Sequence, residues 1–98
     1  MSIVTKEAFL KQKIRNFIIF IENKIGKDNN IFRDFEGYHN NLNAFLQAMI
    51  QLSSLCKGRI DDKMILKYFE MKGVEHKLCQ EDITLINRYF VMFVKLLD

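Results

Sequence analysis

Proline and tryptophan are absent from this sequence of 98 residues, and glycine and cysteine are scarce, with four and two residues respectively. Without proline, no position has a locked φ angle or lacks a backbone N–H donor, so the composition permits long uninterrupted helices. Two cysteines do not form a disulfide framework. We therefore interpret Cys56 and Cys79 as free thiols buried in apolar surroundings.

Long apolar runs are also missing. The longest, Tyr89–Val94, is far shorter than the about 20 residues that a membrane-spanning helix needs. The first seven residues lack the charged region and the following apolar region of a signal peptide. We therefore expect a soluble, cytoplasmic protein with no membrane partner.

Apolar residues as a class are abundant: 49% of the chain is hydrophobic, including nine phenylalanines. A chain of this length has room for one core, so we expect a single domain over residues 1–98. The net charge is +3, and the charges alternate in sign along the chain, as on a solvated surface. This weakly basic balance argues against a nucleic-acid mimic, which needs a dense acidic surface.

Four segments carry apolar residues at the 3.6-residue spacing of a helix, namely residues 6–25, 42–57, 62–72 and 80–97. Capping residues bound the segments. The first begins after Thr5 and ends at Gly26, the second begins after Asn41 and ends at Gly58, and the third begins at Asp61 or Asp62 and ends at Gly73. The pattern predicts an all-α fold, a compact and antiparallel bundle of about four helices.

The stretch between the first two segments, residues 26–41, is rich in Asn and Asp and contains Gly37. These residues compete with helical hydrogen bonding or weaken it, so the stretch is predicted to be an irregular connection with one short turn near residues 31–35. Its aromatic side chains, Phe32, Phe35 and Tyr38, are expected to cover the core.

The last segment has two apolar stripes. Ile83, Ile86, Phe90, Phe93 and Leu97 form the first, and Leu85, Tyr89, Met92 and Leu96 form the second beside it. Two stripes fit either a central helix or a helix that contacts another chain. The first segment also has apolar residues outside its main stripe, so we expect a homodimer or a different protein partner.

Metal and catalytic sites are not indicated. A structural zinc site has two closely spaced ligand pairs, whereas of His39, Cys56, His76 and Cys79 only the last two are close in sequence. Residues 28–36 lack the glycine and the ligand register of a calcium loop. No glycine-rich phosphate loop, nucleotide fingerprint or serine motif occurs. We therefore expect no enzymatic activity, no metal and no cofactor.

Nucleic-acid binding through a helix-turn-helix is also disfavoured. The interval from Gly73 to Cys79 is longer than the about three or four residues of that turn. The last helix offers mainly Asn87, Arg88 and Lys95 to read base edges, and the rest of its surface is too apolar.

The remaining class is a protein that binds another protein. The favoured hypothesis is a small inhibitor, such as an immunity protein that blocks a toxin or effector domain; this is an analogy at the level of the fold. The alternatives are a chaperone or adaptor that covers an apolar segment of a secreted client, and a viral accessory protein. The predicted contact residues, with Tyr38 and Tyr89 as anchors, are Phe32, Phe35, Tyr38, Leu85, Arg88, Tyr89, Met92 and Leu96.

Overall fold

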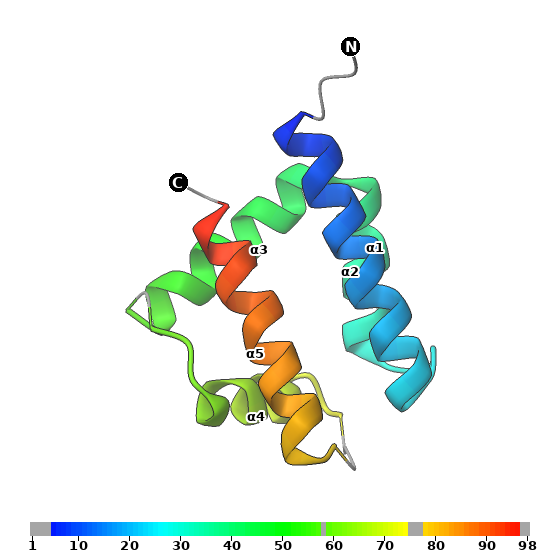
Figure 1. Ribbon diagram of the computed structural model, residues 1–98, viewed down its shortest axis with the longest axis vertical. Helices are drawn as coiled ribbons and strands as arrows, with labels where there is room; N and C mark the ends of the chain where they lie inside the picture. The colour runs from blue at the N-terminus through cyan, green and yellow to red at the C-terminus, as the bar shows by residue number, and fades with distance from the viewer. Residues whose placement is uncertain (1–4, 58, 75–77, 97–98) are drawn as a thin grey trace.

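The computed structural model describes residues 5–57, 59–74 and 78–96 (Figure 1). These residues form helices and no strand, so the all-α prediction is confirmed. There is one helix more than the four expected: α1 Lys6–Ile25, α2 Asn30–Asn40, α3 Leu42–Leu55, α4 Asp62–Met71 and α5 Gln80–Lys95.

The predicted capping residues bound the helices. The Thr5 hydroxyl accepts a hydrogen bond from the Ala8 amide at 3.0 Å, and Gly26 ends α1 with a φ of 83°. Asn41 and Asp61 cap α3 and α4 in the same way as Thr5 caps α1, each accepting from the amide three residues on. Gly58, the predicted end of the second segment, lies outside the described residues.

Helix α2 replaces the irregular connection predicted for residues 26–41, so that prediction was wrong. Asn29 caps the helix instead of disrupting it: its side-chain oxygen accepts from the Phe32 amide at 2.8 Å, and its side-chain nitrogen donates to the Gly26 carbonyl at 2.8 Å. The buried face of α2, formed by Ile31, Phe32 and Phe35, stabilises the helix. Burial of this face outweighs the low helix propensity of asparagine and glycine.

Phenylalanine rings from four helices meet at the centre of the core. Phe35 of α2 lies 4.5 Å from Phe17 of α1, measured between ring centroids. It also lies 6.4 Å from Phe45 of α3, and 6.2 Å from both Phe90 and Phe93 of α5. All five rings are fully buried, and most rings in the cluster are tilted or perpendicular to each other, as aromatic quadrupoles prefer.

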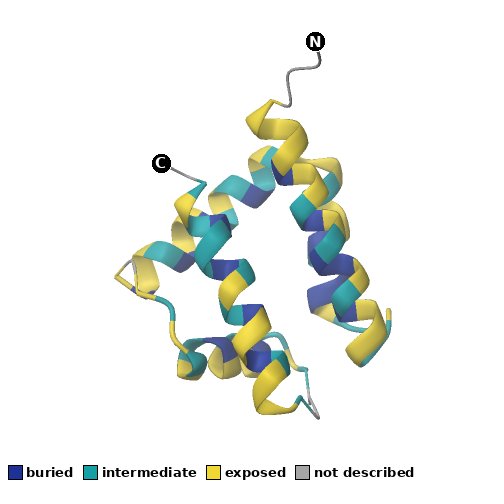
Figure 2. Ribbon diagram, viewed as in Figure 1, coloured by how far each residue is buried: buried dark blue, intermediate teal, exposed yellow. Residues whose placement is uncertain are grey.

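The helices are not all antiparallel. In Figure 1, α1, α2 and α5 run roughly along the long axis, α3 runs obliquely to it and α4 lies across it. Helix α5 packs against α1, α3 and α4, and the buried positions face inward from each helix (Figure 2). Helices α3 and α4 make few direct contacts with each other, which leaves a space between their facing sides.

The two thiols are in different environments. Cys56 is buried as predicted, and this burial raises its pKa, with a further increase from the charge of Asp61. Cys79 is exposed, which corrects the prediction that both thiols are buried. It occupies the N-cap position of α5.

The first turn of α5 is held by Asp82. Its carboxylate pairs with the Lys24 ammonium of α1 at 3.1 Å and accepts from the Cys79 amide at 3.4 Å. The hydrogen bond from Lys24 and those from Cys79 hold the pKa of Asp82 below its usual value. No described helix is both long enough and apolar enough to cross a membrane.

Candidate protein-binding site

A groove of about 490 Å³ lies between α3 and α4. One wall consists of Ala48, Leu52 and Leu55 of α3, and the other consists of Met64, Tyr68 and Met71 of α4. Buried Met49 lies at its base, and Tyr38 of α2 also lines it. We refer to this concavity as the α3–α4 groove.

The outer edges of the α3–α4 groove are apolar and exposed. Leu55 is 71% exposed and Met71 is 69% exposed, the highest values among the large apolar side chains of the described residues. Each belongs to a different helix, yet both line the same concavity. Apolar surface in this arrangement is typical of a contact site.

A turn follows the end of α3 on the way to α4. Lys57 has a φ of 54°, an uncommon conformation for a residue other than glycine, and the chain changes direction there. The Arg59 amide donates to the Cys56 carbonyl at 3.0 Å and closes this turn. Helix α4 buries Ile65 and Phe69 in the core and packs on α5.

The charged side chains among the described residues that line the groove are Lys67 and Lys72. The Lys72 ammonium pairs with Asp34 of α2 at 2.7 Å and lies 5.7 Å from the ring centroid of Tyr68. Lys67 is exposed and forms no ion pair with any residue in the described ranges. The groove therefore has a positive edge with one cation that is not neutralised.

The two tyrosines of the groove are anchored in the core by their rings. Tyr38 contacts Phe35 at 5.1 Å and Phe45 at 5.8 Å between centroids, and Tyr68 contacts Phe90 at 5.2 Å. Burial raises the pKa of both phenols, and the negative charge of Asp34 adds to this effect. Both hydroxyls are thus neutral at physiological pH and act only as hydrogen-bonding groups.

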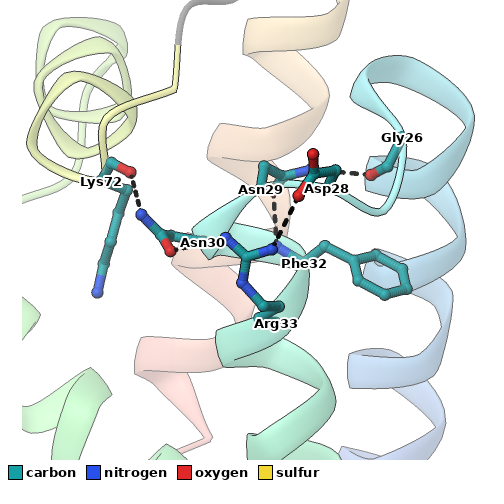
Figure 3. Close-up of polar contacts among 7 residues, drawn as sticks. All are labelled: Gly26, Asp28, Asn29, Asn30, Phe32, Arg33 and Lys72. Carbon is teal, nitrogen blue, oxygen red and sulfur yellow. Dashed lines mark hydrogen bonds and ion pairs between the residues drawn. The ribbon is translucent and has the colours of Figure 1, made fainter.

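A polar corner fixes the end of α4 against α2 (Figure 3). The Asn30 side chain donates to the Lys72 carbonyl at 2.9 Å, across 42 residues of sequence. Arg33 donates to the side-chain oxygen of Asn30 at 3.0 Å and pairs with Asp28 at 3.2 Å. The hydrogen bond from Asn30 and the ion pair between Lys72 and Asp34 join the end of α4 to α2.

The predicted contact residues of α2 are in different places. Phe32 and Phe35 are buried in the core, so neither ring is presented at the surface. Tyr38, the preferred anchor from this stretch, is half-buried and lines the α3–α4 groove.

The predicted contact residues of α5 lie on a separate surface. Leu85 and Arg88 are exposed, whereas Tyr89, Met92 and Leu96 are half-buried. Arg88, Met92 and Leu96 line a shallow depression on α5 that shares no residue with the groove. The Tyr89 ring packs on Phe17 at 5.2 Å, and burial raises its pKa. The α5 helix therefore combines a core face with a partly exposed apolar edge.

Sequence reasoning missed Leu55, Met64, Lys67 and Met71. The available signal was that Met64 and Met71 are seven residues apart, hence on one face of α4, yet lie outside its stripe of buried residues. The pattern shows an additional apolar face but not the position of α3 opposite it.

Among the described residues, no three His, Cys, Asp or Glu side chains lie close enough together to hold a metal ion, and His76 lies outside these residues. No family model, curated protein or solved structure matches the chain. The interpretation of its function therefore depends on the geometry of its own surface.

Proposed function

We propose that the protein is a non-enzymatic protein-binding module whose main contact surface is the α3–α4 groove. The observation that carries this proposal is the placement of Leu55 and Met71. Two strongly exposed apolar side chains from different helices border one concave site, and a partner that covers them would remove both from water.

Within this class, we favour a small cytoplasmic inhibitor of the immunity-protein type, which binds a toxin or effector domain and blocks it. A chaperone or adaptor that covers an apolar segment of a secreted client is the second candidate. The shape of the groove supports the second candidate in particular, because a concave apolar site suits a projecting segment better than a flat surface.

Site-specific crosslinking in the native cell tests the proposal. A photoreactive amino acid at position 55 should crosslink to a protein partner, which mass spectrometry then identifies. The matched control is position 50: Ile50 is also on α3 and is 57% exposed, but it does not line the groove. Crosslinks at position 50 but not at position 55 would place the contact outside the groove.

A binding assay with the identified partner tests the contact residues individually. Tyr38→Ala should weaken binding by about 2 kcal/mol or more if the ring is a hot spot, and Tyr89→Ala should have a smaller effect. Circular dichroism must show unchanged helical content in both variants, since both rings also contact the core. If only nucleic acid is captured, with an affinity that falls steeply as salt rises, the proposed class is wrong.

A further inference from the structure

We infer that the α3–α4 groove binds an amphipathic α-helix of the partner, one that carries Asp or Glu beside its apolar residues. This inference rests on the proposed function and specifies the element that enters the groove. Three features of the groove support it: the length of its walls, the chemistry of its lining, and the charge at its edge.

Each wall is a stripe of side chains about two helical turns long. Ala48, Leu52 and Leu55 have the spacing i, i+4, i+7 on α3, and Met64, Tyr68 and Met71 have the same spacing on α4. Seven residues of helix correspond to about 10 Å of axis. A docking helix that places apolar side chains at i, i+3 or i+4, and i+7 presents a stripe of this same length.

The chemistry of the walls disfavours an extended segment. A bound β-strand gains its affinity from hydrogen bonds to the free backbone edge of a sheet. Both walls of the groove are helices, in which the backbone groups are already paired within the element. Apolar side-chain contact is therefore the main interaction that the walls offer, and a helix with one apolar face uses it fully.

Methionine makes the lining adaptable. Met49 lies at the base, and Met64 and Met71 form much of the α4 wall. The unbranched thioether side chain has several accessible rotamers, so it can repack around apolar groups of different shape. The groove therefore suits Leu, Ile, Met or Phe on the incoming helix without requiring one particular side chain.

The charge of the groove determines the polar residues of the partner helix. Lys67 and Lys72 are the charged residues among its described lining, and Lys72 is already paired with Asp34. Lys67 therefore provides the free positive charge, and a carboxylate beside the apolar stripe of the incoming helix would pair with it. Charges at the edge of an interface act mainly on the rate of association and on the choice of partner.

The test is to pan a displayed library of random peptides, with no conformation imposed, against the full chain. The enriched sequences should have apolar residues at helical spacing, flanked by Asp or Glu. Leu55→Glu should weaken the selected peptides by about tenfold or more, because it places a charge at the exposed apolar edge. Ile50→Glu, the matched control on another face of α3, should leave their affinity unchanged.

Charge reversal tests the acidic component separately. Panning against Lys67→Glu should enrich helices with Lys or Arg in place of Asp or Glu. Selection of extended or proline-rich peptides, or of helices whose affinity is unaffected by Leu55→Glu, would overturn the inference. Concentration-dependent self-association that Leu55→Glu abolishes would also overturn it, since the occupant would then be a second copy of this chain.

The inference and the proposed function can fail independently. If a cellular partner crosslinks through position 55 but no acidic helical peptide is selected, the binding function stands and the helix assignment is wrong. If acidic helical peptides bind the groove but no protein crosslinks through position 55 in the cell, the chemistry of the groove is confirmed and the proposed function is not.

Discussion

Replacing Phe35 with alanine would remove the ring at the centre of the aromatic core. This side chain is fully buried and contacts aromatic rings from α1, α3 and α5, as well as Tyr38 of its own helix. Replacements of buried Phe by Ala generally cost about 3–5 kcal/mol in the free energy of unfolding. We expect a value near the upper end, because several aromatic pairs are lost together with the buried area.

A loss of this size is large for this protein. At about 0.05–0.15 kcal/mol per residue, a chain of 98 residues has a total stability of about 5–15 kcal/mol. Urea unfolding followed by circular dichroism measures the change. If the dependence of stability on urea is about 1.5 kcal/mol per molar, a cost near the upper end of that range should lower the midpoint by about 3 M.

Phe9→Ala is the matched control for this experiment. Phe9 is 40% exposed near the start of α1, so its removal should cost less than about 1 kcal/mol. If Phe35→Ala also costs less than about 1 kcal/mol, the reasoning is refuted, because Phe35 could not then be the centre of the core. Such a result would leave Phe35 as a candidate for contact with a partner, the role that the sequence predicted for it.

Three further predictions concern the backbone, the pH dependence and the thiols. Gly26→Ala should destabilise the protein by about 1–3 kcal/mol, because a side chain is strained at a φ of 83° even though its Cβ would meet no neighbour. Gly37 is in the middle of α2 with equally open surroundings, so Gly37→Ala should instead stabilise the protein by about 0.5–1 kcal/mol. Denaturant midpoints measure the stability of both variants, and equal effects of the two substitutions would contradict this reasoning. The lowered pKa of Asp82 means that its contribution to stability is present above the unfolded pKa of about 3.9 and is lost as pH falls through the folded value. The difference in melting temperature between the wild type and Asp82→Asn should therefore shrink from about pH 6 to about pH 2, and a constant difference would count against the assignment. A thiol reagent should modify exposed Cys79 in the native protein, whereas Cys56, which is buried and has a raised pKa, should react only on unfolding. Mass spectrometry of the peptides measures the two modification rates, and equal rates in the native protein would contradict this prediction.

The helix ends were predictable from the sequence because capping is a local interaction. Thr5 and Asn41 satisfy amides only three residues away, and Gly26 adopts a positive φ that glycine tolerates. The buried stripe of α1 was predictable for the same reason, since its spacing is set within the helix. These features require no knowledge of the rest of the chain.

The features that sequence reasoning missed depend on distant parts of the chain. Asn29 and Gly37 indicated an irregular stretch, but the Phe35 ring is stabilised in α2 by rings more than fifty residues away, on α5. The α3–α4 groove exists because α4 packs on α5 rather than on α3, and no local pattern specifies that choice. Tyr38, a contact residue predicted from the sequence, lines this groove, whereas Leu55, Met64, Lys67 and Met71 of the same lining were not among the predicted residues.

The position of Phe93 also affects the order in which the core forms during synthesis. Its ring lies 6.0 Å from Phe17, 6.2 Å from Phe35 and 5.1 Å from Phe45, and so joins α1, α2 and α3. The ribosome produces these three helices before α5, so the contacts that Phe93 makes with their rings cannot form until α5 has emerged. In that interval the partly folded chain exposes apolar surface of the kind that chaperones bind.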